Sequence, residues 1–120
     1  LIMNYDSLFE GNYKNLYIAE GPFDALKMDY FLKPYSRSTC VFGKNASNSQ
    51  ISLLRSVAKN FKNVYLILDK DEMASKLKLS QQFGDFLTGI IDVPGNYKDP
   101  GDLPASEIHA VDKWSLNETA

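Results

Sequence analysis

The feature that most constrains this chain is an apolar run at residues 64–68, Val-Tyr-Leu-Ile-Leu, which passes directly into Asp69-Lys70-Asp71. A short run that is apolar at every position is typical of a central parallel strand covered by helices on both faces. Open parallel sheets bind ligands beyond the carboxyl ends of their strands, which is where these two carboxylates fall. The segment therefore predicts a buried strand with a candidate functional site directly after it.

The rest of the chain alternates strands with helices. Other segments rich in apolar residues predict further strands at residues 16–19, 39–42 and 88–93. Apolar residues at helical spacing, Leu26 and Tyr30 among them, predict helices at residues 22–34, 47–61, 72–83 and 105–116. Four successive strand–helix units imply an α/β fold, with an open parallel sheet of about four strands and helices on both faces. We expect an irregular lead-in at residues 1–14, a core at 15–104 and a C-terminal helical segment at 105–120.

Composition excludes several classes of protein. The 120 residues suffice for one domain, and 44% apolar and 23% charged residues are ordinary for a globular one. No apolar run approaches the ~20 residues of a membrane span, so we expect no membrane partner. The single cysteine, Cys40, excludes an internal disulfide or a multi-cysteine zinc site and favours a reducing, cytoplasmic setting. The chain does not begin with Met, so we expect it to be part of something longer.

The charge balance argues against simple electrostatic binding of nucleic acid. The chain has 13 basic and 15 acidic residues, a net charge of −2, and its basic residues are spread out with no run longer than two. A domain that holds DNA by bulk electrostatics is normally basic. Contact with nucleic acid would therefore need metal ions or a neighbouring basic domain.

Acidic residues follow three of the four predicted strands. Glu20 follows the first, Asp69 and Asp71 follow the third, and the loop after the fourth contains Asp99 and Asp102. Each could be a helix cap or a turn residue. Converging carboxylates also repel one another, and Mg²⁺, which prefers oxygen ligands, relieves that repulsion. We favour a metal site, because capping does not require acids at several exits of one sheet.

Three lysines flank the same predicted edge, and they are Lys44, Lys70 and Lys98. They could contact phosphates or only offset the acidic charge, and the sequence does not separate these two interpretations.

Four segments, in order, resemble motifs of the Toprim fold, which topoisomerases, bacterial-type primases and related nucleases share. Residues 16–26, Leu-Tyr-Ile-Ala-Glu-Gly-Pro-Phe-Asp-Ala-Leu, resemble its first motif, residues 40–43 its glycine-bearing second motif, and residues 64–71 its Asp-x-Asp motif. Residues 98–103, Lys-Asp-Pro-Gly-Asp-Leu, are similar to a Lys-Asp-Pro element of primases, particularly those of phages and mobile elements. The resemblance covers about residues 15–104 and implies a Toprim-like fold.

The resemblance also implies roles for individual residues. Glu20, Asp69 and Asp71 would be catalytic and would bind Mg²⁺, or Mn²⁺ in its place, with Asp99 and Asp102 as further metal ligands. Contacts with the nucleotide or its phosphates are implied for Gly21, Gly43, Lys44, Lys70 and Lys98. Many primases have an acid where this chain has Gly101, and Asp102 is the candidate substitute.

The function implied is that of a DNA primase domain, a nucleotidyltransferase that makes short RNA primers during phage or mobile-element replication. Its partners would be a single-stranded DNA template, ribonucleoside triphosphates and a replicative helicase. Two alternatives stay open: a metal-dependent nuclease that uses the same acids, and a nucleotide-binding domain without turnover. A topoisomerase would need a nucleophilic tyrosine, and none of the seven tyrosines has a recognisable context.

Overall fold

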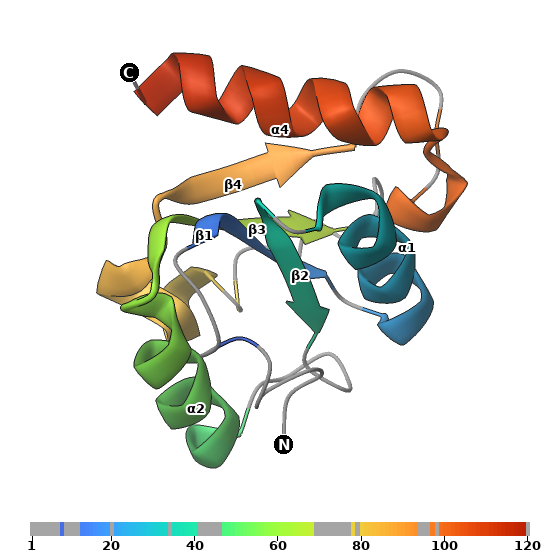
Figure 1. Cartoon of the computed structure of the whole chain (residues 1–120). Coiled ribbons are helices and arrows are strands. Elements are labelled where there is room, and N and C mark those ends of the chain that lie inside the picture. The colour runs from blue at the N-terminus through green and yellow to red at the C-terminus, as the bar shows by residue number, and fades with distance from the viewer. Residues whose placement is uncertain are drawn as a thin grey trace.

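Four parallel strands form one open sheet in the order β2-β1-β3-β4 (Figure 1). The computed structural model describes residues 8, 13–19, 21–33, 35–40, 47–68, 78, 80–93, 97 and 99–119. The strands are β1 (Tyr13–Ala19), β2 (Arg37–Cys40), β3 (Phe61–Leu68) and β4 (Gly89–Asp92). The predicted α/β fold with a Toprim-like, all-parallel sheet of four strands is confirmed.

The helices begin where the local sequence provides start signals. They are α1 (Pro22–Leu32), α2 (Asn48–Ala58) and α4 (Ala105–Thr119), with 3₁₀ turns η2 (Gly84–Phe86) and η3 (Pro100–Asp102). Pro22 occupies the first turn of α1, where its missing N–H is not needed. Ser47 and Gln50 exchange hydrogen bonds in a capping box at the start of α2. Within the described residues, no helix has the length and apolar character that crossing a bilayer requires.

The central strands bury both of their faces. Along β1, Leu16 and Ile18 point to one face of the sheet, whereas Tyr17 and Ala19 point to the other. Residues of β3 alternate in the same way. The first face packs against α2, and the second packs against α1 and α4 (Figure 1). Helices therefore cover both faces of the sheet, as the apolar runs predict.

Three predicted boundaries were wrong. β1 begins at Tyr13, inside the segment expected to be an irregular lead-in, and Phe61 opens β3 rather than ending a helix. β2 begins at Arg37, two residues before its predicted start. The apolar pattern missed this start because β2 buries polar side chains, including those of Arg37 and Ser38. In the helix predicted at residues 72–83, residues 78 and 80–83 are helical, and 72–77 and 79 lie outside the described part.

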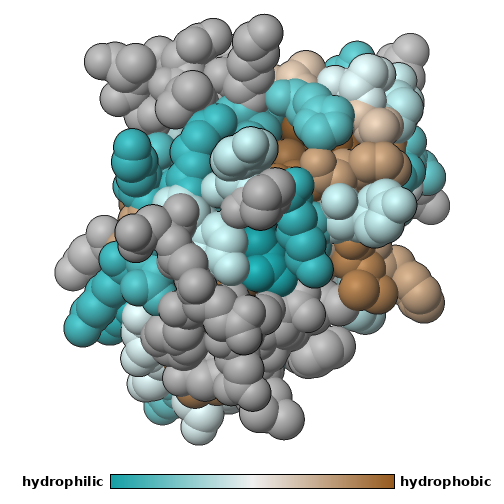
Figure 2. Space-filling model, in the orientation of Figure 1, coloured by the Kyte–Doolittle hydropathy of each residue, from teal (hydrophilic) through white to brown (hydrophobic). Residues whose placement is uncertain are grey.

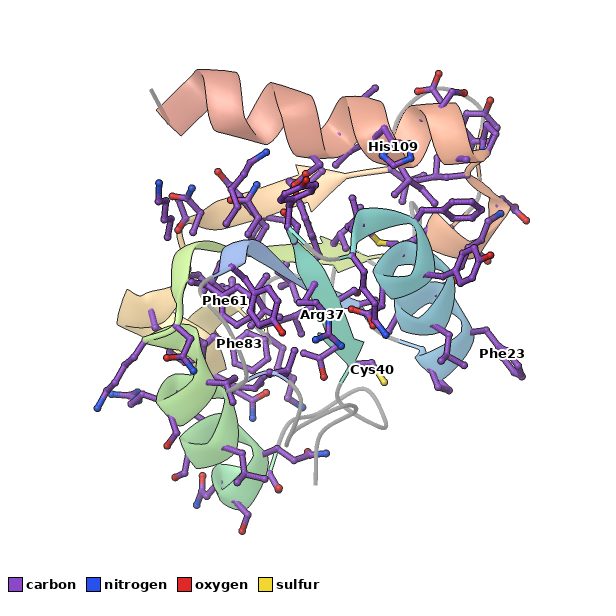
Figure 3. The ribbon with its side chains drawn as sticks, in the orientation of Figure 1. Phe23, Arg37, Cys40, Phe61, Phe83 and His109 are labelled. Carbon is purple, nitrogen blue, oxygen red and sulfur yellow. The ribbon has the colours of Figure 1, made fainter. Side chains whose placement is uncertain are left out.

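A buried ion pair explains how β2 tolerates a charge. Arg37 donates from Nε to Asp29 Oδ1 at 2.7 Å and from Nη2 to Asp29 Oδ2 at 3.0 Å. The Ser38 amide donates to the same carboxylate at 2.9 Å. Arg37, labelled on β2 in Figure 3, also stacks over the Tyr13 ring and donates to its hydroxyl. This bidentate pair joins α1 to β2 and satisfies both charges.

Helix α1 presents large hydrophobic side chains to solvent. Leu26 and Tyr30, which belong to the apolar pattern that predicts this helix, are 50% and 77% exposed, and Phe23 is 82% exposed. The inner face of α1 is instead formed by Ala25, Met28 and Leu32, together with Asp29. Figure 2 shows hydrophobic side chains gathered at the right of the molecule, over α1.

Candidate active site at the carboxyl edge of the sheet

The carboxyl ends of all four strands meet at one edge of the sheet. Ala19, the last residue of β1, pairs with Cys40, the last residue of β2. Ala19 also pairs with Ile67 of β3, and Leu68 pairs with Asp92 at the end of β4. The segments that carry the candidate residues therefore leave neighbouring strands at the same edge.

Most of the predicted site residues lie outside the described part of the chain. These residues are Glu20, Gly43, Lys44, Asp69, Lys70, Asp71 and Lys98. Glu20 follows Ala19 and Asp69 follows Leu68 in the sequence, and β1 and β3 are adjacent in the sheet. Their assignment to catalysis, metal or phosphate stays a prediction. Gly21, Asp99 and Asp102 are described. Gly21 is the N-cap of α1, Asp99 is the N-cap of η3, and Asp102 is the last residue of η3.

Asp99 caps the 3₁₀ turn that it precedes. Its Oδ1 accepts a hydrogen bond from the Asp102 amide at 3.0 Å, and the Asp102 side chain is exposed. The capping role that the sequence left open for these acids is therefore present at Asp99. One carboxylate oxygen suffices for the cap, so this contact leaves the second oxygen of Asp99 for a further role.

Helix α1 holds η3 through two hydrogen bonds to Gly101. The Gly101 amide donates to Asp24 Oδ1 at 2.8 Å, and Lys27 Nζ donates to the Gly101 carbonyl at 2.7 Å. Asp24 belongs to the Glu-Gly-Pro-Phe-Asp segment and Gly101 to the Lys-Asp-Pro-Gly-Asp segment. The tertiary structure thus joins the first and last of the four motifs directly.

Glycine at position 101 is explained by how closely Asp24 approaches. A Cβ atom there would lie 2.6 Å from Asp24 Oδ1 and 3.3 Å from Asp99 Oδ1. Any larger residue would have to displace the carboxylate that accepts the Gly101 hydrogen bond. Many primases carry an acid at this position. In this chain the carboxylates of Asp24 and Asp99 lie too close to position 101 for a side chain to fit without moving them.

Cys40, at the end of β2, has a thiol whose pKa is raised. Burial, together with the charge of Asp24, raises the pKa of the Cys40 thiol to about 11. Cys40, labelled in Figure 3, is the last residue of β2 and lies at the carboxyl edge of the sheet. Within the described residues alone, no three His, Cys, Asp or Glu side chains form a cluster suited to a metal ion.

A second polar cluster, which the sequence analysis missed, ties α4 to β1. Asp112 accepts hydrogen bonds from Tyr17 Oη at 2.7 Å, Asn15 Nδ2 at 2.9 Å and Ser36 Oγ at 2.9 Å. Lys14 Nζ lies 3.3 Å from its other oxygen. Burial opposes the charge of Asp112, but these donors outweigh burial and lower its pKa below the usual range. No local pattern indicates this cluster, because its residues come from three separate segments.

Asp24 and Lys27 position η3, and neither of them is among the predicted site residues. The spacing of Asp24, three residues after Gly21 in the first motif, was the available signal. Its acceptor role depends on a residue 77 positions away, which no local pattern indicates.

The fold of this chain is similar to that of chains in two solved structures. It is similar to a chain in the structure of bacteriophage T7 lagging-strand DNA polymerase interacting with primase domains of two gp4 subunits bound to an RNA/DNA hybrid and dTTP. That likeness has a TM-score of 0.55 and 17% identity, and it covers 92% of this chain and 55% of the other. The primase fragment of the bacteriophage T7 primase-helicase protein is also similar, with a TM-score of 0.52 and 14% identity over 99% of this chain and 48% of that one.

These likenesses show a shared fold. The chain spans about half the length of the two solved chains. No protein-family model and no curated protein sequence matches it.

Proposed function

We propose that this chain is the Toprim domain of a phage-type DNA primase, which joins ribonucleotides into short primers on single-stranded DNA. The observation that carries the proposal is the contact between Asp24 and Gly101. It unites the Glu-Gly-Pro-Phe-Asp segment with the primase-type Lys-Asp-Pro element on a fold shared with a phage primase fragment. The Lys-Asp-Pro element that makes this contact favours a primase over a nuclease, because the resemblance associates this element with primases and not with the nucleases that share the fold.

Within this proposal, Glu20, Asp69 and Asp71 form the catalytic centre beyond the adjacent ends of β1 and β3. Asp99 and Asp102 extend it from η3, whose position is fixed by Asp24 and Lys27. Gly21 and Gly43 let the backbone approach the incoming nucleotide. Three lysines, Lys44, Lys70 and Lys98, would neutralise its phosphates.

Divalent metal ions fit this set of residues by their chemistry. The candidate side chains are carboxylates, which Mg²⁺ prefers, and Mn²⁺ accepts the same ligands. A bound ion would stabilise the charge that develops on the phosphoryl oxygens during nucleotide transfer. The protein's own residues would orient the triphosphate and the primer 3′-hydroxyl, and Glu20 would take up or donate a proton.

The partners proposed are those of a replicative primase. The T7 complex to which this chain is similar contains an RNA/DNA hybrid and dTTP, and the T7 primase fragment comes from a primase-helicase protein. Single-stranded DNA, nucleoside triphosphates and a helicase are the corresponding partners here. The net charge of −2 makes a basic neighbouring domain the expected holder of most of the template.

The test begins with metal binding. Calorimetric titration with Mg²⁺ and Mn²⁺ should show saturable binding to the wild type and at least tenfold weaker binding to Asp71→Asn. Asp85→Asn is the matched control, because η2 immediately precedes β4 and so lies at the opposite edge of the sheet. Equal binding to all three proteins would contradict a metal site at Asp71.

Primer synthesis is then measured on a single-stranded template with all four ribonucleoside triphosphates. In an assay that also supplies a basic template-binding domain, we expect oligoribonucleotides with the wild type and with Asp85→Asn, and none with Asp71→Asn. Cleavage of the template without synthesis would overturn the primase proposal in favour of the nuclease. Metal binding without either activity would favour the non-catalytic alternative.

A further inference from the structure

An open cleft of about 780 Å³ lies at the amino edge of the sheet, opposite the candidate active site. Its lining residues are Tyr13, Lys14, Tyr35, Lys59, Asn60, Phe61, Lys62 and Asp112. Tyr13 opens β1 and Phe61 opens β3, so the cleft lies where these adjacent strands begin. In Figure 3, Phe61 and Phe23, which is in the first turn of α1, lie on opposite sides of the view.

Lysines give this cleft a positive charge on an otherwise acidic chain. Lys14 is paired with Asp112 at 3.3 Å. Lys59 and Lys62 are exposed, and neither forms an ion pair with any residue in the described part of the chain. Among the described residues, Lys59 at the end of α2 and Lys62 at the start of β3 therefore give the cleft two positive charges without an acidic partner.

Aromatic rings lie beside these lysines. Tyr35 is 75% exposed, although its carbonyl accepts a 2.7 Å hydrogen bond from the Lys14 amide. Its backbone is therefore fixed while its ring faces solvent. The Tyr13 and Phe61 rings stack with their centroids 5.3 Å apart. The Tyr13 amide donates to the Asn60 carbonyl, which holds the two strand starts together.

We propose that this cleft binds single-stranded nucleic acid, with Lys59 and Lys62 contacting phosphates and the Tyr35 ring stacking on an unpaired base. Exposed lysines combined with an exposed aromatic ring are the combination that single strands bind to. A metal ion does not fit, because Asp112 is the cleft's acidic residue and already accepts from four donors. A duplex does not fit the aromatic ring, because its bases are already stacked on one another.

This inference rests on the proposed function, since a primase must hold its template, but it concerns the opposite edge of the sheet. β1 spans roughly 20 Å between the two edges, at ~3.3 Å per residue. A strand that reached from the active site to the cleft would be held at two separated points. The cleft would then hold the unpaired template strand at a point away from the place of synthesis.

The test is fluorescence anisotropy of a labelled oligodeoxythymidylate with the 120-residue chain, in the absence of metal and over a range of salt concentrations. The slope of log affinity against log salt is negative, and we expect its magnitude to fall by about 1.4 in Lys59→Ala/Lys62→Ala, since each single-strand phosphate contact contributes about 0.7. Lys62→Ala alone should lower it by about 0.7. The matched control is Lys78→Ala, which removes an exposed lysine that does not line the cleft and should leave the slope unchanged.

Tyr35 tests the stacking part of the proposal. Tyr35→Ala should weaken oligonucleotide binding by about fivefold or more, and Tyr35→Phe should bind like the wild type because it keeps the ring. A blunt duplex of the same length should compete poorly. Equal competition by the duplex, or wild-type binding by Tyr35→Ala, would overturn stacking on an unpaired base.

A further variant separates this inference from the proposed function. Asp71→Asn should bind the oligonucleotide like the wild type under metal-free conditions, even if it abolishes primer synthesis. Unchanged affinity and salt slope in Lys59→Ala/Lys62→Ala would overturn the cleft proposal whatever the activity of Asp71→Asn. Circular dichroism of each variant checks that the fold is intact.

Discussion

Asp24 and Gly101 lie 77 residues apart in the sequence, yet the Gly101 amide donates a 2.8 Å hydrogen bond to Asp24 Oδ1. The same oxygen would lie 2.6 Å from a Cβ atom at position 101. The contact that joins the two motifs is therefore also the contact that requires glycine.

Gly101→Ala should lower the free energy of unfolding by about 1–2 kcal/mol, because Asp24 must move and its hydrogen bond is weakened. Urea denaturation measures this change. In an Asp24→Ala background, alanine at position 101 should cost less, since the obstructing oxygen is gone. Additive effects of the two substitutions would contradict the close contact.

Asp29→Ala should destabilise the fold by about 3–5 kcal/mol, because it leaves the guanidinium of Arg37 buried without its partner. Lys33→Ala is the matched control. Lys33 pairs with the same carboxylate at 3.4 Å but is half exposed, and its loss should cost less than about 0.5 kcal/mol. Thermal and urea unfolding distinguish the two variants. Similar losses in both would contradict a dominant role for the Arg37 pair.

Asp112→Ala should cost about 2–4 kcal/mol at pH 7, because it leaves the donors on Asn15, Tyr17 and Ser36 without their acceptor. The pKa of Asp112 is lowered in the folded chain. Its charge therefore adds stability above the unfolded pKa of about 3.9, and that stability is lost as the pH falls through the lower folded value. Urea denaturation between pH 7 and pH 3 should show a shallower acid dependence in Asp112→Asn than in the wild type. An unchanged acid dependence would exclude this role.

The Cys40 thiol should resist alkylation at pH 8 in the folded chain and react readily in urea. It is buried, and burial with the nearby charge of Asp24 raises its pKa to about 11. A raised pKa means that the neutral thiol favours the folded state at neutral pH and that this contribution declines as the pH rises from about 9 toward 11. Mass spectrometry after iodoacetamide treatment measures the reaction. Equally fast labelling of native and unfolded protein would contradict the burial.

Local sequence patterns were enough to predict a parallel sheet of four strands and the succession of strands and helices along the chain. The apolar run at residues 64–68 is the end of β3. The helix predicted from residue 47 does start there, with Ser47 as the N-cap of α2. Hydrophobic periodicity and helix caps act over a few residues, so a single sequence carries them. The same patterns misplaced the start of β2, and they did not indicate which apolar residues of α1 face solvent. Arg37 is buried through a partner on another element, and Leu26 and Tyr30 are apolar residues that the fold leaves exposed.

For the candidate site too, some features follow from the sequence and others from the tertiary structure. By itself, the sequence determined that acids follow the strand ends and that four motifs occur in order, because each motif is a short contiguous segment. The tertiary structure decided that Asp24 accepts a hydrogen bond from the Gly101 amide, that Asp112 accepts from donors in two separate segments, and that dispersed lysines gather at the amino edge. These relationships join residues that only the packing of helices on the sheet brings together, and no periodicity within the chain encodes them.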